Sequence, residues 1–149
     1  KMIIGETYAG RLTSFDINSD SSLSNRQVWA QMMPTSYYFF TKIVRALKIP
    51  VKEGRATPYP VPDGICLDDQ NGIWVASPTT SEVIRYTQGG MVTQRIKTPD
   101  RAYACMLGGK TGRTLFISTA KTSDPEIASR EKNGKIYSTE VEYSHAGRP

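Results

Sequence analysis

Asp63 is the residue whose type and setting best fit chemistry in this sequence. It stands in the tripeptide Pro62-Asp63-Gly64, just before a short apolar run. A carboxylate is a hard oxygen ligand that suits Ca²⁺ or another divalent ion, and it can also act as a general acid or base. Pro-Asp-Gly is equally a favourable turn sequence, so the tripeptide alone leaves a structural and a functional interpretation open.

The histidine and the cysteines give weaker signals. The single histidine, His145, lies in a polar tail, which does not favour a catalytic Ser-His-Asp or Cys-His arrangement. Cys66 and Cys105 alternate with apolar neighbours, which predicts buried thiols. Two cysteines also argue against a disulfide-stapled scaffold and against a cysteine-based zinc site.

Two polar turn sequences resemble ligand-binding motifs only superficially. Asp68 and Asp69 open the stretch Asp-Asp-Gln-Asn-Gly, which a hairpin turn explains without a second calcium site. Residues 108–112 hold glycines and a lysine but lack the spacing and the Ser or Thr of a phosphate loop. We therefore interpret both stretches as hairpin turns.

Length and composition predict an ordinary globular domain. The chain has 149 residues, of which 38% are hydrophobic and 22% charged, enough for one domain with a real core. No stretch approaches the roughly 18 apolar residues of a membrane helix, so a membrane span is excluded. No secretory signal is visible, which favours a cytoplasmic protein. The first residue is Lys rather than Met, from which we expect that the sequence begins within a longer chain.

The net charge of +5 is concentrated in one segment. Residues 35–59 contain five basic side chains and one acidic side chain, so this segment carries a charge of +4 and the rest of the chain carries +1. A nucleic-acid-binding protein would instead spread basic side chains over one face of its fold. We therefore expect no nucleic-acid partner.

The apolar residues alternate in short runs separated by Gly, Asn, Asp and Ser, which predicts an all-β protein. Ten strands are expected. They cover residues 2–7, 11–17, 26–32, 64–68, 72–76, 82–87, 91–97, 102–107, 113–119 and 135–141.

These strands recur as units. Residues 64–77 resemble residues 103–118, with Cys66 and Cys105 at the same place and 105 − 66 = 39 residues apart. A period of about 40 residues with four short strands is the size of a β-propeller blade. An ordinary β-sandwich with accidental similarity is the alternative.

The strands divide as three, four and three. The first unit lacks an innermost strand before Met2, and the last lacks an outermost strand after Val141. This division predicts part of a ring with two open sheet edges, through which the chain could self-associate.

The segment 34–60 interrupts the pattern. It is apolar and basic and then becomes rich in proline. We expect a long loop inserted between two blades, and deletion of residues 35–59 should leave folding intact. The alternative is an amphipathic helix that meets a membrane surface or a partner.

Several motifs, in order and at blade spacing, resemble the gluconolactonase or regucalcin (senescence marker protein) family. The similarity covers nearly the whole chain except residues 34–60. The motifs are ETYAGRLTSFD at 6–16, LSNRQVW at 23–29, PDGICLD at 62–68, IWVA at 73–76, CMLGG at 105–109, LFISTA at 115–120, GKI at 134–136 and AGRP at 146–149.

The resemblance implies a six-bladed propeller, of which residues 1–149 form the C-terminal half, roughly its last three blades. It also implies a metal-dependent hydrolase that opens sugar or related lactones. Asp63 would bind the metal and act as the catalytic acid or base. Ca²⁺ is expected first, with Zn²⁺, Mg²⁺ or Mn²⁺ as alternatives.

One departure from the family limits this expectation. The other metal ligands of the family, a Glu and Asn residues, come from blades that precede this sequence. In the repeat, Asp63 falls on Ala102, so the next blade offers no substitute carboxylate. Arg101 and Tyr103 are candidates for the substrate channel. Taken alone, the chain should be inactive, and the alternative function is a non-catalytic propeller fragment that binds through its open edges.

Overall fold

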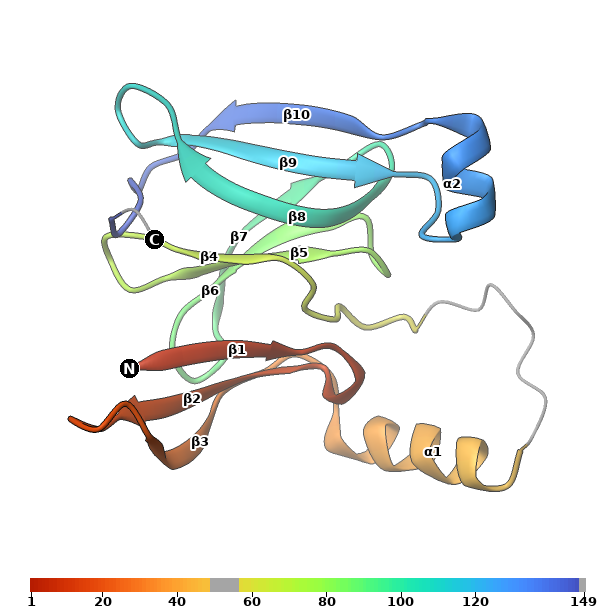
Figure 1. Ribbon diagram of the computed structural model, residues 1–149, viewed down its shortest axis with the longest axis horizontal. Helices are drawn as coiled ribbons and strands as arrows, with labels where there is room; N and C mark the ends of the chain where they lie inside the picture. The colour runs from red at the N-terminus through yellow and green to blue at the C-terminus, as the bar shows by residue number, and fades with distance from the viewer. Residues whose placement is uncertain (49–56, 148–149) are drawn as a thin grey trace.

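Ten short strands build three antiparallel sheets that stack on one another in the computed structural model (Figure 1). The structure describes residues 1–48 and 57–147. The strands are β1 (Met2–Glu6), β2 (Arg11–Ile17), β3 (Leu23–Gln31), β4 (Ile65–Leu67), β5 (Ile73–Ser77), β6 (Glu82–Tyr86), β7 (Val92–Lys97), β8 (Arg101–Gly108), β9 (Thr114–Ala120) and β10 (Lys135–Glu140).

The all-β prediction is confirmed, and each expected strand has its counterpart. Strands β1–β3 form the first sheet, β4–β7 the second and β8–β10 the third, each in chain order. The division into three, four and three strands is therefore the one that the turn sequences predict. The third expected strand was misplaced at its start, because β3 begins at Leu23 rather than Arg26.

The turns between strands use residues that tolerate left-handed backbone. Asn71, in the β4–β5 turn, has a φ of 57°, and Gly90, in the β6–β7 turn, has a φ of 90°. Asparagine and glycine adopt these angles at low cost. The hairpins are consequently tight, and each sheet folds from a continuous piece of chain.

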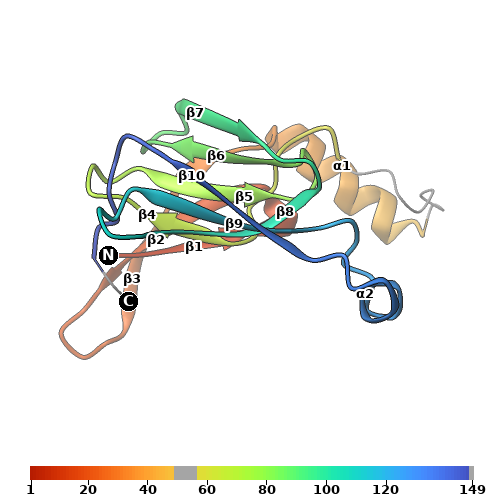
Figure 2. The same cartoon turned by 90° about the horizontal axis from the view of Figure 1, so that it is seen from above.

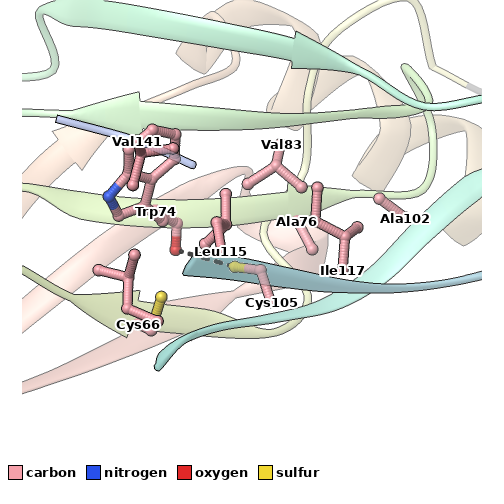
Figure 3. Packing of buried hydrophobic residues seen from close by; sticks show 10 residues of the cluster. Cys66, Trp74, Ala76, Val83, Ala102, Cys105, Leu115, Ile117 and Val141 are labelled. Atoms are coloured by element: carbon pink, nitrogen blue, oxygen red, sulfur yellow. Dashed lines mark hydrogen bonds between the residues drawn. The ribbon is translucent and has the colours of Figure 1, made fainter. Parts of the chain in front are cut away.

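The second sheet lies between the other two (Figures 1 and 2). Its strands β5 and β6 are buried on both faces. The sequence of β5 is accordingly apolar except for Ser77, whereas β6 carries the charged residues Glu82 and Arg85, which are paired. Two core clusters result. The cluster between the first and second sheets contains Leu12, Trp29, Ala30, Met32, Ile73, Val75, Ile84 and Tyr86. The cluster between the second and third sheets contains Cys66, Trp74, Ala76, Val83, Ala102, Cys105, Leu107, Leu115, Ile117 and Val141 (Figure 3).

The segment expected to be a loop over residues 34–60 begins instead with a helix. Helix α1 spans Thr35–Ala46, so the loop prediction is wrong there. The helix of the alternative is present, and its contact with a membrane surface or a partner stays a prediction. Between Pro34 and Pro50 the sequence has neither Gly nor Pro, and nothing stops helix formation. The part of the segment at residues 49–56, with two of its basic residues, lies outside the described residues.

A second helix, α2 (Pro125–Glu131), was not expected from the strand pattern. The Asp124 carboxylate caps it by accepting hydrogen bonds from the backbone N–H groups of Glu126 and Ile127, and Pro125 occupies its first turn. Asp-Pro-Glu is a recognisable helix start. No helix among residues 1–48 and 57–147 has the length and apolar character that crossing a membrane requires.

Candidate functional site

Asp63 lies at the entrance of β4, the strand at the free edge of the second sheet. Its backbone N–H donates to the carbonyl of Ala76 at 3.0 Å, and the Ala76 N–H donates to the carbonyl of Gly64 at 2.9 Å. These two bonds extend the β4–β5 ladder to the Pro-Asp-Gly turn. Pro62 is fully buried while Asp63 is exposed. Pro62 therefore anchors the turn in the protein interior, and Asp63 lies at the surface.

The turn is also held against the other two sheets. The Gly64 N–H donates to the carbonyl of Tyr103, in β8, at 2.8 Å. On the other side, a Cβ at Gly5 of β1 would lie 3.2 Å from Pro62 Cβ and 3.6 Å from the Asp63 carbonyl oxygen. One end of each of the three sheets therefore meets at Asp63.

The electrostatic setting of Asp63 is unusual for an exposed carboxylate. Partial burial raises the pKa of the Asp63 carboxyl above its usual value of 3.8. Among the described residues, no ion pair and no side-chain hydrogen bond involves this carboxylate. A carboxyl with a raised pKa and no partner is suited to exchanging a proton or accepting a ligand from outside the chain.

The structure brings one of the two channel candidates next to Asp63. Tyr103 is half-buried at a bulge in β8, and its hydroxyl is enclosed without a hydrogen-bond partner among the described residues. Arg101, at the start of β8, is exposed and pairs across the ladder with Ala120. Arg101 makes no ion pair within the described part of the chain.

The donor set for a divalent ion is incomplete in this chain. Within residues 1–48 and 57–147, no group of three or more His, Cys, Asp or Glu side chains is placed to hold a metal ion. Asp63 offers one carboxylate, whereas Ca²⁺ takes six to eight oxygen ligands. The described residues therefore do not fit a complete calcium site, and no reaction step can be derived through a metal held by them alone.

A cavity of about 550 Å³ lies between the first and second sheets, and Asp63 does not line it. Its walls include Ile3, Trp29, Ile65, Leu67 and Ile73. The polar residues Lys1, Asn71 and Gln88 complete its lining, so the cavity is apolar on one part of its wall and polar on another.

Asp68 forms a buried ion pair that the sequence did not reveal. Its carboxylate accepts hydrogen bonds from Arg85 Nε at 2.6 Å and from an Arg85 terminal nitrogen at 3.1 Å. It also accepts from the backbone N–H of Gly72 at 2.8 Å. The Arg85 guanidinium carbon lies 4.1 Å from the centroid of the Tyr143 ring. Asp68 is thus fully engaged, which agrees with the interpretation of its stretch as a turn.

Glu6 is the centre of a second charged cluster. It pairs with Arg11 at 2.9 Å and with Arg26 at 2.7 Å, and the Thr13 hydroxyl donates to it. Burial alone would raise the pKa of Glu6, but the hydrogen bonds from Arg11 and Thr13 together with the charge of Arg11 lower it to about 2. The pairing holds β1, β2 and β3 together on one face, so the role of Glu6 is structural.

Glu82, on β6, is a buried carboxylate like Asp68. Arg95 donates to it at 2.8 Å, and Lys97 Nζ lies 3.1 Å from its other oxygen. Both cations come from β7, and the three residues line a cavity of about 480 Å³. Their pairing neutralises the carboxylate and ties β6 to β7.

Comparison with known proteins gives a family match over most of the chain. The family model described as SMP-30/Gluconolactonase/LRE-like region matches residues 1–121. Regucalcin of Oryctolagus cuniculus is 34% identical over 74 residues, which cover 48% of this chain and 25% of that protein. Regucalcin of Xenopus laevis is 30% identical over 112 residues, which cover 66% of this chain and 38% of that protein.

Solved structures show the same fold. A luciferin-regenerating enzyme superposes with a TM-score of 0.65 at 20% identity, over 97% of this chain and 42% of that one. A calcium-binding protein, regucalcin, from Agrobacterium tumefaciens strain C58 superposes with a TM-score of 0.59 at 17% identity, over 98% and 43%. The chain therefore spans less than half the length of the relatives and structures that it matches.

Proposed function

This chain belongs to the SMP-30/gluconolactonase/LRE-like family, and from that premise we propose that it supplies the Asp63 carboxylate to a metal-dependent hydrolase of sugar or related lactones. The family resemblance found in the sequence is confirmed. The activity, the metal and the role of Asp63 are the proposal. The observation that carries it is the solvent-facing Asp63 carboxyl, which has a raised pKa and no partner among the described residues and lies where the three sheets meet.

The proposal gives the chain's own residues distinct parts. Asp63 exchanges the proton when water attacks the lactone, because its carboxylate is exposed at the turn and accepts no side-chain hydrogen bond from the described residues. The backbone carbonyl of Tyr103 accepts the hydrogen bond of Gly64, the residue after Asp63, and the Tyr103 hydroxyl has no partner among the described residues. A bound divalent cation, Ca²⁺ in the first instance, would polarise the lactone carbonyl.

Because Asp63 is one ligand out of several, the proposal includes completion of the site by residues outside the described part. We further propose that the three sheets are three blades of a six-bladed ring, residues 1–149 being its C-terminal half. The match to 42% and 43% of two solved structures supports this.

Hydrolysis of a sugar lactone by the native protein tests the proposal. It is compared in the wild type, in Asp63→Asn and in Asp69→Asn. Asp69 is the matched control, because it is also exposed and stands at the other end of the same strand. Asp63→Asn should lower the rate at least about 100-fold, Asp69→Asn should not, and a chelator should abolish hydrolysis until Ca²⁺ is returned. Full activity in Asp63→Asn would refute the assignment.

A second candidate function is a non-catalytic module that binds through its open sheets. On the outer face of the first sheet, Ile4 and Val28 are 37% and 53% exposed; on that of the third sheet, Met106, Phe116 and Ile136 are 47%, 41% and 74% exposed. Exposed apolar faces beside free strand edges mark interaction sites. Concentration-dependent self-association in sedimentation, together with no hydrolysis in any variant, would favour this function over the enzyme.

A further inference from the structure

Cys66 and Cys105 approach each other across two different sheets. Cys66 is in β4 of the second sheet and Cys105 is in β8 of the third. The backbones of these strands touch just before the cysteines, where the Gly64 N–H donates to the Tyr103 carbonyl at 2.8 Å. A Cβ at Gly64 would lie only 2.6 Å from Ala104 Cα. The missing side chain therefore allows the contact that brings the two thiols together.

Both thiols are buried in the core cluster between the second and third sheets. Cys105 Sγ lies 3.5 Å from the Trp74 carbonyl oxygen and 3.7 Å from that of Gly64, and both cysteines are reduced and 7% exposed (Figure 3). A hydrogen bond from Cys105 lowers the pKa of Cys66. The same hydrogen bond, together with burial, raises the pKa of Cys105. Cys66 is thus the thiol that ionises first.

Of the two cysteines, only Cys66 lines the two cavities next to the pair. Cys66 lines the cavity of about 550 Å³ between the first and second sheets and a second cavity of about 350 Å³ near the C-terminal residues Ala146 and Gly147. Cys105 lines neither of these two cavities. A small oxidant in either of these cavities therefore reaches Cys66 before Cys105.

We propose that Cys66 and Cys105 are a redox modification site that forms a reversible disulfide with hydrogen peroxide. The Cys66 thiolate attacks one peroxide oxygen, the O–O bond breaks and hydroxide leaves, so Cys66 becomes a sulfenic acid. The Cys105 sulfur then attacks the Cys66 sulfur, its proton joins the departing hydroxide, and water is released. Two thiols and one peroxide give one disulfide and two waters.

This bond would join the second sheet to the third. In the reduced protein these sheets share side-chain packing and single backbone hydrogen bonds such as that between Gly64 and Tyr103. The site is independent of the proposed lactonase, because neither sulfur takes part in the chemistry assigned to Asp63. It gives a role to the cysteine pair, to which the hydrolytic proposal assigns none.

The test is exposure of the native protein to hydrogen peroxide, followed by denaturation, alkylation of free thiols and peptide mapping. In the wild type, both cysteines should become resistant to alkylation, a disulfide should link the Cys66 and Cys105 peptides of one chain, and a dithiol reductant should restore both thiols. The Cys105→Ser variant should accumulate a sulfenic acid on Cys66 that dimedone traps, and Cys66→Ser should not trap dimedone on Cys105.

Several outcomes would overturn the proposal. They are two thiols that still alkylate after oxidation, a disulfide that links separate chains, or dimedone trapped on Cys105 rather than Cys66. Circular dichroism shows whether each variant folds. If a variant does not fold, the peptide map of the wild type still tests the proposal. Cys66→Ala and Cys105→Ala repeat the comparison without a new hydroxyl in the core.

Discussion

At the scale of single residues, the carboxylates of Asp68, Glu6 and Glu82 differ from that of Asp63 in what surrounds them. Asp68, Glu6 and Glu82 each face one or more guanidinium or ammonium groups, whereas Asp63 faces none among the described residues. A paired carboxylate stabilises the fold, and an unpaired one at the meeting point of three sheets is free for chemistry. This contrast separates structural acids from the candidate functional acid.

The ion pair of Asp68 should be among the most important polar contacts for stability. Asp68→Asn leaves the Arg85 guanidinium buried without its counter-ion, so we expect a loss of about 3–5 kcal/mol in the free energy of unfolding. Asp69→Asn, in the adjacent and exposed position, should cost less than about 1 kcal/mol. Urea denaturation of the two variants measures the difference, and equal stabilities would contradict the account of Asp68.

Glu6 should make stability depend on acidity. Its pKa is about 2 in the folded chain against an ordinary value of 4.5, so its stabilising effect is complete above pH 4.5 and is lost as the pH falls toward 2. The melting temperature of the wild type should therefore fall more steeply over that interval than that of Glu6→Gln. Parallel curves for the two proteins would show that the pairs with Arg11 and Arg26 contribute nothing.

The sequence located Asp63 but not its surroundings. Asp63 could be found because its turn and its family motif are local. The partnership of Asp68 with Arg85 could not, because it joins a turn residue to a residue of β6 that is 17 positions away in the chain. A usable signal was present nevertheless: Arg85 interrupts the apolar run of β6, and a buried arginine needs a counter-ion.

At the scale of elements, β4 and β8 are the pair on which the candidate site depends. Gly64→Ala would place a Cβ 2.6 Å from Ala104 Cα and 2.9 Å from the Tyr103 carbonyl oxygen. We expect the two strands to separate at a cost of about 1–3 kcal/mol. Gly134→Ala is the control, since the nearest atom to its Cβ would be 3.9 Å away. Thermal unfolding distinguishes the two, and an unaffected Gly64→Ala would contradict the close contact.

Helix α1 should be dispensable for the sheets. Its apolar side chains Phe39, Phe40 and Ile43 are exposed, and none of its residues belongs to either core cluster. Replacing residues 35–59 by a short glycine-serine linker should leave strand content unchanged and shift the melting temperature by less than about 5 °C. Circular dichroism of the purified deletion provides the check, and loss of soluble expression would contradict it.

The elements were predictable to different degrees for physical reasons. A hairpin turn is marked by Asn and Gly within a few residues of each other, so the ten strands and their order could be predicted from the sequence. The boundaries of β3 were less clear because most of its residues are exposed and lack apolar alternation. Helix α2 was missed although Asp124 and Pro125 mark its start, because strand periodicity dominated the interpretation on either side.

At the scale of the whole molecule, the stacking of three sheets leaves two outer faces and the edge of β1 uncovered by described residues. The order of the sheets was predictable from the repeat, because sheets built from consecutive hairpins pack next to their neighbours in the chain. The convergence of Gly5, Asp63 and Tyr103 was not, since it depends on how the sheets twist against each other. That convergence is what turns one carboxylate into a candidate site.

The most direct test of the central claim is the size of the species that hydrolyses a sugar lactone. The native protein would be separated by mass, and each fraction assayed with and without chelator. Because Asp63 is the one carboxylate of the described residues that we propose as a metal ligand, we predict chelator-sensitive hydrolysis only in a species larger than the 16.6 kDa of this chain. Chelator-sensitive hydrolysis by a 16.6 kDa monomer would contradict the claim that Asp63 needs ligands from beyond these residues.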